Sequence, residues 1–504
     1  QSCPPIKTKR KGLMTEAGRL NHVGADSAEE FRSGRLRKSG IADKIMTVFS
    51  CCVFALLTLS VSLFSERTGH FALYSGFTFG LKLKDLRKRK SAMQPIATPA
   101  TLNTDDLKAM VYGACFLASG GGGPISMALD FLQRMSGTVS LLPVTQLERD
   151  KTALMVVDLG SPDAAAEGHG FTAPVNAFKS LSAYLKEKEQ KTIAYLLPGE
   201  IGAVNTLIPF YIASMMDGKI AVIDADPSGR ADPRLTETLL AATNAPSCPA
   251  MIASDTQTGA GLRCDWTAEP FASTLFLDLS AAELEEKARE TVSQPEYHQV
   301  GGMACYPLDT NFLQSPAAKN SLVYNSVGRA LIIGRQILSS SSVPALSMLL
   351  DLLHIHNYIF TEGKISKIIN RTHGGFDVGK IIFSAPAGDY WVYYKNESLL
   401  AWDVKQGRPH AIAPDCINIM LAAADGTTPA GTPLSTADIR EGQSCTLWGT
   451  ACPEAIRITP VISQFMDDLN DILSAFPEDH VAVSAYIPIE DLNLTLCTTE
   501  QAEK

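Results

Sequence analysis

The chain has 504 residues, enough for about two to four domains. Hydrophobic residues make up 45% of it and charged residues 19%, a composition that excludes an intrinsically disordered chain. Residues 1–92 hold 17 Lys and Arg against 7 Asp and Glu, whereas residues 93–504 hold 27 against 46. Such an acidic body argues against nucleic-acid binding, because phosphate contacts need clustered cations.

Residues 1–92 are a basic extension that contains an uncharged stretch at 45–65. This stretch matches the length of a transmembrane helix, but basic residues flank both of its ends and set no orientation. Two interpretations stay open. The extension is an artefact of the gene model, since composition changes at Met93, or it is a membrane anchor. If the extension is an artefact, we expect a cytoplasmic protein. The eleven cysteines, which include no CxxC pair, favour the same location.

Residues 97–340 have the pattern of an α/β domain. Predicted helices within 101–119 and at 124–136 flank four glycines, and predicted strands at 152–162, 191–200, 219–230 and 248–256 alternate with further helices. This alternation is typical of a layered domain with a largely parallel sheet. From 341 to 460, short alternating runs with Gly-containing turns predict an antiparallel β domain, either a barrel or a sandwich, and residues 461–504 form a C-terminal tail.

The glycines Gly120, Gly121, Gly122 and Gly123 do not form a nucleotide site. A P-loop needs a Lys after its glycines, and here Pro124 follows. A dinucleotide fingerprint needs a preceding strand, and here a helix precedes. We therefore expect no nucleotide cofactor. The loop either offers free N–H groups to a ligand oxygen or is a tight turn that allows close packing.

Acidic side chains follow three of the predicted strands. They are Asp158, Glu200 with Asn205 nearby, and the pair Asp224 and Asp226. Ligands bind at this edge of open α/β sheets, so the pattern predicts a site for acid–base chemistry. A divalent metal held by Asp158, Glu200 and Asp224 is a second interpretation. Alternatively, each of these acidic residues only caps a helix or forms a salt bridge, and no ligand binds here.

Several segments occur in the order of a known family: "ASGGGGP", "PGEIGAVNTLIPF", "VIDADPSGRADPRLTETLL", "GKISKIINRTHGGFDVGKIIF", "YYKNESLLAW" and "PDCINIMLAAADGTT". Over roughly residues 100–460 the chain resembles the S-methyl thiohydantoin desulfurase-like proteins, which are found beside or fused to hydantoinase/oxoprolinase enzymes. The sequence departs from the family pattern at Pro124, at Pro227-Ser228 and at Ala203. The resemblance implies a three-layer α/β domain followed by a β-barrel-like domain.

The resemblance also implies chemistry on hydantoin-like or S-methyl thiohydantoin-like five-membered cyclic amides, with C–S or C–N hydrolysis. In this hypothesis Glu200 or Asp224 is the general base and Asp226 or His169 orients the water. Arg230 holds an anionic part of the substrate, and the glycine loop and Asn205 complete the binding site. The alternatives are a non-catalytic accessory subunit of a hydantoinase/oxoprolinase and a cyclic-amide binding module. We expect a homo-oligomer.

Overall fold

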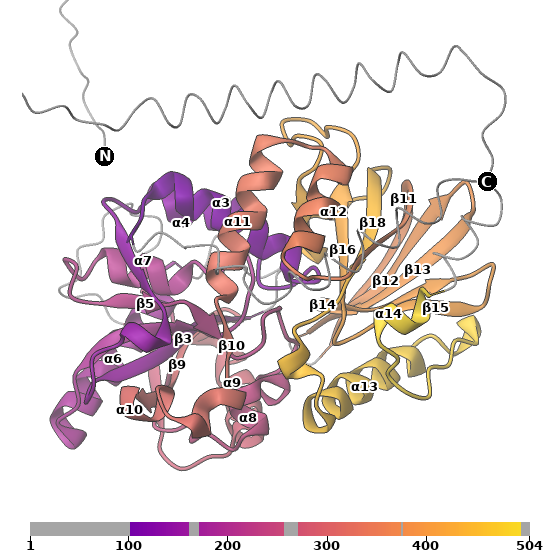
Figure 1. Cartoon of the computed structure of the whole chain (residues 1–504). Coiled ribbons are helices and arrows are strands. Elements are labelled where there is room, and N and C mark those ends of the chain that lie inside the picture. The colour runs from indigo at the N-terminus through magenta and orange to yellow at the C-terminus, as the bar shows by residue number, and fades with distance from the viewer. Residues whose placement is uncertain (1–100, 161–170, 257–270, 374–375, 495–504) are drawn as a thin grey trace, which may run out of the picture. The chain divides into compact units, whose positions relative to one another are not determined.

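The computed structural model describes residues 101–160, 171–256, 271–373 and 376–494 (Figure 1). The predicted transmembrane stretch 45–65 and the rest of residues 1–92 lie outside these ranges. Within them, no helix combines the length and the hydropathy needed to cross a bilayer.

The first domain is built on an eight-stranded mixed sheet. Its strand order is β1-β2-β5-β4-β3-β9-β7-β8. The four strands from β2 to β3 are parallel, whereas β1, β9, β7 and β8 are antiparallel to their neighbours. The strands are β1 (Thr101–Leu102), β2 (Val139–Leu142), β3 (Thr152–Gly160), β4 (Ile193–Pro198), β5 (Ala221–Ile223), β7 (Ala250–Ala253), β8 (Ser273–Phe276) and β9 (Val300–Asp309).

The prediction of a largely parallel sheet was wrong for half of the strands. The main reason is β9, which pairs with β3 along nine residues and lies inside the sheet. After its first residue, Val300, come Gly301 and Gly302, and it also contains Pro307, all residues that weaken a strand signal. Gly302 is required there because a Cβ would overlap the backbone of Ala173 at the start of α6.

Helices cover both faces of this sheet. Along β3, Leu154 and Val156 join one buried cluster, while Met155 and Val157 join another on the opposite face. This gives the helix–sheet–helix layering that the family resemblance implies. One face packs against α3 (Thr104–Leu117), α4 (Ile125–Gln133), α6 (Ala173–Glu189), α7 (Ile208–Ser214) and α11 (Ser326–Ser339), and the other against α9 (Ala281–Val292) and α10 (Thr310–Leu313).

The second domain contains an eight-stranded antiparallel sheet in the order β15-β14-β13-β12-β11-β18-β16-β17. The prediction of an antiparallel domain is confirmed, but the sheet is open: β15 and β17 are its edges, and β17 has only two residues with which to pair. Two bulges in β11 let this long strand pair with β18 and then with β12. The strands are β11 (Asn357–His373), β12 (Phe376–Ala385), β13 (Gly388–Lys395), β14 (Glu397–Asp403), β15 (Arg408–Ile412), β16 (Cys416–Leu421), β17 (Pro433–Leu434) and β18 (Ser444–Thr450).

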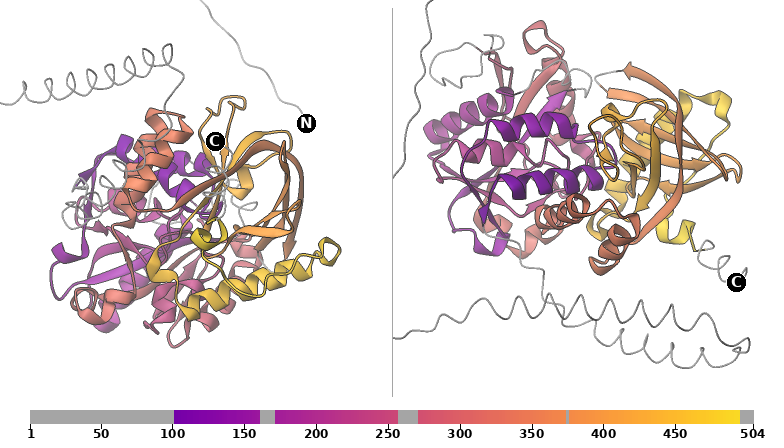
Figure 2. Two further views of the ribbon diagram at one scale, coloured as in Figure 1. Left: turned by 45° about the vertical axis from the view of Figure 1, so that its right-hand side comes forward. Right: turned by 90° about the horizontal axis from the view of Figure 1, so that it is seen from above.

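The residues after 460, predicted as a tail, include two helices that pack on the second domain (Figure 2). In α13 (Thr459–Ser474) the buried side chains Val461, Phe465, Leu469 and Ile472 lie at helical spacing. They join a cluster with Leu399 and Leu400 of β14. The remaining elements are α8 (Leu239–Ala242), α12 (Val343–Leu352), α14 (Ile489–Leu492) and the two-stranded pair β6 (Ala225–Asp226) and β10 (Val323–Tyr324).

Helices α3 and α11 cross at two glycines and lie side by side (Figure 1). A Cβ at Gly334 would overlap the carbonyl oxygen of Ala109, and one at Gly113 would overlap that of Ala330. The two backbones therefore touch, and no larger residue fits between them.

We predict that Gly334→Ala lowers the free energy of unfolding by about 1–3 kcal/mol, because the added methyl group forces the helices apart. Ser339→Ala, at the exposed end of the same helix, is the matched control and should change stability by less than about 0.5 kcal/mol. Urea denaturation of both variants measures the difference. Equal stabilities would contradict the close crossing.

Candidate functional site

A cavity of about 130 Å³ lies where β3 and β4 end. Its walls include Asp158 from β3, Glu200 and Asn205 from the loop after β4, and the loop residues Gly122 and Gly123. Glu397, the first residue of β14, completes this part of the wall. The cavity is therefore shared between the first domain and the sheet of the second domain.

The four glycines divide into two pairs with different surroundings. Gly120 and Gly121 meet the second domain: the Gly120 carbonyl accepts a hydrogen bond from the Thr436 N–H at 2.8 Å, and the Glu397 carboxyl lies against the Cα of Gly121. Gly122 and Gly123 line the cavity with φ of +66° and +84°, values that favour glycine. In the described part of the chain, no acceptor meets the N–H of either residue.

Glu200 is held by a hydrogen-bond chain. Its Oε1 accepts from Asn205 Nδ2 at 2.7 Å and its Oε2 accepts from the Asp232 N–H at 2.9 Å. Asn205 Oδ1 accepts in turn from the Asp158 N–H at 2.9 Å, which joins the ends of β3 and β4. Burial outweighs these hydrogen bonds and raises the pKa of Glu200 to about 7. Glu200 therefore exchanges a proton near neutral pH.

Four further carboxyl groups line the cavity, and three of them, Asp158, Asp232 and Glu397, are strongly affected by burial. Burial raises the pKa of each of these three well above the ordinary value for its residue type. Oδ1 of Asp158 and Oε2 of Glu397 are shielded from solvent and have no hydrogen-bond partner within the described ranges, whereas Ser228 Oγ donates to Asp232. The cavity thus holds protonatable groups rather than a set of fixed negative charges.

Arg230 lies behind these carboxyl groups and does not line the cavity. Its guanidinium is fully buried, with Nε 3.8 Å from Asp232 Oδ1 and Nη1 donating at 2.6 Å to the carbonyl of Pro414. A second donation from Nη1 reaches the carbonyl of Asp415 at 3.3 Å. In this structure, Arg230 therefore contacts protein groups of both domains rather than the space where a ligand would bind.

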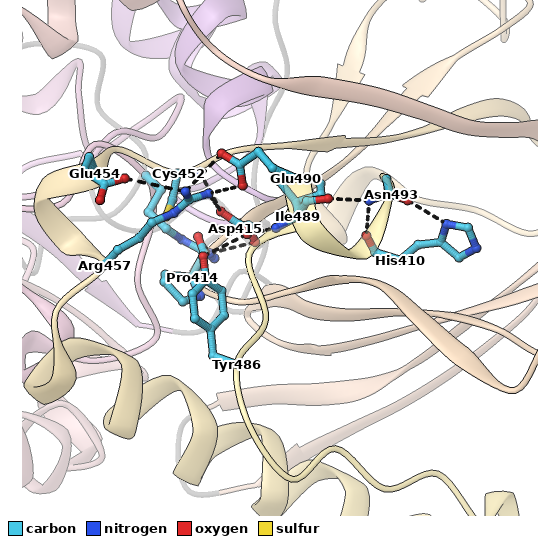
Figure 3. Close-up of polar contacts among 11 residues, drawn as sticks. His410, Pro414, Asp415, Cys452, Glu454, Arg457, Tyr486, Ile489, Glu490 and Asn493 are labelled. Carbon is cyan, nitrogen blue, oxygen red and sulfur yellow. Dashed lines mark hydrogen bonds and ion pairs between the residues drawn. The ribbon is translucent and has the colours of Figure 1, made fainter. Parts of the chain in front are cut away.

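Asp415 organises the buried polar cluster next to Arg230 (Figure 3). Its Oδ1 accepts from the Cys452 N–H at 2.9 Å and from Arg457 Nη2 at 2.8 Å. Its Oδ2 accepts from the Ile489 N–H at 2.8 Å and from the Tyr486 hydroxyl at 3.0 Å. One carboxylate thus fixes the segment around α14 to the end of the second sheet.

We predict that Asp415→Ala lowers the free energy of unfolding by about 3–5 kcal/mol, because it leaves the Arg457 cation and two N–H donors without this acceptor. Glu454→Ala is the matched control: its carboxylate also lies near Arg457, at 3.6 Å, but is 89% exposed. That substitution should cost less than about 1 kcal/mol. Thermal unfolding of both variants gives the comparison, and similar losses would contradict it.

The other predicted carboxylates lie outside the cavity wall. Asp224 Oδ1 accepts from the Gly328 N–H at 2.9 Å, at the start of α11. Asp226 Oδ1 accepts from the N–H groups of Ser228 and Gly229 at 2.7 and 2.5 Å, and burial raises the pKa of Asp226 to about 6. Both contacts are of the capping and turn type.

The structure does not bring Asp158, Glu200 and Asp224 together as a metal-binding set. No group of three or more His, Cys, Asp or Glu side chains able to hold a metal ion occurs among the described residues. His169 lies outside these residues, so its place relative to the cavity is not given.

The cavity wall also includes two arginines, Arg234 and Arg289, to which the sequence analysis gave no role in the site. Arg234 pairs with Asp468 at 2.7 Å, and Arg289 pairs with Glu285 at 2.5 Å. Arg289 also stacks over the ring of Phe376, 3.6 Å from its centre. Each guanidinium is already compensated by a carboxylate, so this wall adds polarity and little net charge.

Sequence reasoning assigned no role to Asp232, Asn396 or Glu397. Asp232 is the second Asp after Asp224 in a single acidic run, which is a weak signal. Asn396 and Glu397 lie in the family-like segment "YYKNESLLAW", and Asn396 adopts a left-handed φ of +56° before the strand. Only the tertiary structure brings Glu397 to the cavity, because it comes from the other domain.

Comparison with known proteins agrees with this two-domain architecture. The family model of the S-Me-THD-like N-terminal domain matches residues 105–262, and that of the C-terminal domain matches residues 280–463. The chain therefore belongs to the S-methyl thiohydantoin desulfurase-like family. It is also similar to the X-ray crystal structure of a protein from Chromobacterium violaceum, with 23% identity and a TM-score of 0.61 over 77% of this chain and 99% of that one. This similarity supports the fold, and no curated protein matches the chain.

We predict that the stability of the protein falls as pH rises from about 5 to 8. The pKa of Glu200 is higher in the folded protein, about 7, than its ordinary value of 4.5, so the folded state binds more protons across this range. Its contribution is present in full below about pH 4.5 and is lost as pH rises through 7, by up to about 3 kcal/mol.

Glu200→Gln should flatten this dependence, and the exposed Glu148→Gln should leave it unchanged. Denaturant midpoints measured at several pH values test the difference. A wild-type curve as flat as that of Glu200→Gln would contradict the raised pKa.

Proposed function

We propose that the protein is an enzyme that hydrolyses hydantoin-like or S-methyl thiohydantoin-like five-membered cyclic amides, with cleavage of a C–S or C–N bond. The observation that carries the proposal is Glu200, a carboxyl group with a pKa of about 7 in the wall of a small cavity. A general base is most effective when its pKa is close to the working pH. Family membership supplies the class of substrate.

Glu200 is the proposed general base for the attacking water. Asn205 Nδ2 and the Asp232 N–H hold both carboxylate oxygens, which fixes the direction of the remaining lone pairs. A water between Glu200 and the ring carbon would lose its proton to Glu200 as the C–O bond forms. Positioning of the base and the water contributes to the rate enhancement in addition to the proton transfer itself.

The N–H groups of Gly122 and Gly123 are the proposed donors to the ring carbonyl or to the nitrogen on which charge develops. Both residues line the cavity, and no acceptor in the described chain meets their N–H groups. Pre-oriented backbone donors of this type stabilise developing negative charge without rearrangement. Pro124 has no N–H, so the donor set of this loop ends at Gly123.

The size of the cavity agrees with a small ring. Its volume of about 130 Å³ is below the roughly 300–1,000 Å³ that is common for sites of drug-sized ligands. The apolar residues Met127, Met155, Val157 and Met303 supply surface for the ring, and the carboxyl groups and backbone donors supply its polar contacts. This balance supports a small polar heterocycle as the ligand.

We expect the full-length protein to release a thiol from S-methyl thiohydantoins or to open hydantoins, with kcat/KM rising as pH passes through about 7. Glu200→Gln should lower kcat by about 10²–10⁴-fold and remove this acid limb, because the base is lost. Absorbance assays of thiol release or ring opening, run at several pH values, measure both kcat and the acid limb.

The control is Asp403→Asn, a buried carboxyl of β14 outside the cavity wall, which should retain turnover. Full activity of Glu200→Gln would overturn the role of Glu200. Ligand-induced thermal stabilisation without any product would instead favour a cyclic-amide binding module, and activity only with a hydantoinase/oxoprolinase would favour an accessory subunit.

A further inference from the structure

Backbone hydrogen bonds on both sides of Glu397 fix its position in the cavity wall, although it belongs to the second domain. The carbonyl of Asn396, just before it, accepts from Thr436 Oγ1 at 2.7 Å. The N–H of Ser398, just after it, donates to the carbonyl of Ser119 at 2.7 Å. The backbone of Glu397 is thus clamped on both sides, and one clamp is the residue next to the glycine loop.

The glycine loop also makes room for the Glu397 side chain. A Cβ at Gly121 would overlap Oε1 of Glu397, so the carboxyl occupies the place that a side chain would take. Gly121 does not have a left-handed φ, and its backbone conformation therefore does not explain why glycine occurs there. The need for space beside the Glu397 carboxyl does explain it.

The Glu397 carboxyl is buried in the cavity wall, yet its hydrogen-bonding capacity is not used up. The residue is 3% exposed, and Oε2 has no hydrogen-bond partner among the residues that the structure describes. Leaving a buried polar atom without a partner costs free energy that a purely structural residue would avoid. Glu200 lines the same cavity, and the proximity of these two carboxyl groups disfavours simultaneous ionisation of both.

We propose that Glu397 is a catalytic residue, the proton donor to the leaving group, acting together with Glu200 across the cavity. This inference rests on the proposed function. It assigns the two halves of the reaction to different domains: the first domain activates water and the second domain protonates the departing atom.

The step balances for an S-methyl thiohydantoin. The water oxygen bonds to the ring carbon that carries sulfur, the electron pair of its C=N double bond moves to the ring nitrogen, and one water proton passes to Glu200. The second water proton then moves from the added oxygen to that nitrogen and becomes the amide N–H. As the oxygen forms the C=O bond, the C–S bond breaks with its electron pair on sulfur, and the Glu397 proton moves to that sulfur to release methanethiol. Transfer of the proton from Glu200 to Glu397 restores the starting state.

The test compares two thioethers on the full-length protein: S-methyl thiohydantoin and its S-trifluoroethyl analogue, whose thiolate leaves without protonation more readily. Glu397→Gln should lower kcat by about 10²–10⁴-fold on the S-methyl substrate and by less than about tenfold on the S-trifluoroethyl substrate. It should also remove the fall of kcat at alkaline pH, which reports loss of the donor proton. A structural role would not change this leaving-group dependence.

Gly121→Ala provides a second variant that keeps the glutamate. The added methyl group displaces the Glu397 carboxyl, so the same selective loss on the S-methyl substrate is expected, and Asp403→Asn should show neither effect. If the wild type turns over both thioethers and Glu397→Gln loses activity equally on both, the role of Glu397 is overturned and the proposed function is not. Absence of wild-type turnover on both overturns the proposed function and the role of Glu397 with it.

Discussion

The burial of one guanidinium among carboxyl groups is the constraint on which the rest of the site depends. Arg230 is fully buried, and its charge acts on Glu200, Asp232 and Glu397. An unpaired charge in such a place would cost several kcal/mol, so the surrounding groups have to compensate it. Burial raises the pKa values of these three acids, and repulsion between neighbouring carboxyl groups adds to the rise, whereas the Arg230 charge opposes it.

The same guanidinium joins the two domains. Its Nη1 donates to the carbonyls of Pro414 and Asp415, whose own carboxylate fixes the segment near α14 (Figure 3). The glycine loop makes a second connection through Gly120 and Thr436. Both connections lie close to the cavity. Any relative movement of the domains would therefore disturb the protonation of the acids that line it, and the site and the domain interface have to form together.

The cavity shows how a short glycine run serves two purposes. Gly120 and Gly121 allow the second domain to approach, whereas Gly122 and Gly123 line the cavity, and no acceptor in the described chain meets their N–H groups. Gly122 itself packs so closely on Gly202 that neither residue tolerates a Cβ. The two interpretations that the sequence left open, close packing and ligand binding, are thus divided between the two halves of one loop.

The sequence by itself determined three of the four parallel strands of the first domain, several of its helices and the antiparallel character of the second domain, because hydrophobic periodicity and turn residues act locally. It also pointed to Asp158, Glu200 and Asn205, since the ends of neighbouring parallel strands meet at one edge. It did not predict β2 or α11. It did not reveal β9, whose glycines are explained only by the backbone of α6 above them. Nor did it separate Asp224, which caps α11, from Glu200, which lines the cavity. Only the tertiary structure brings Glu397 to the glycine loop, because that contact joins residues almost 300 positions apart, and no local pattern encodes it.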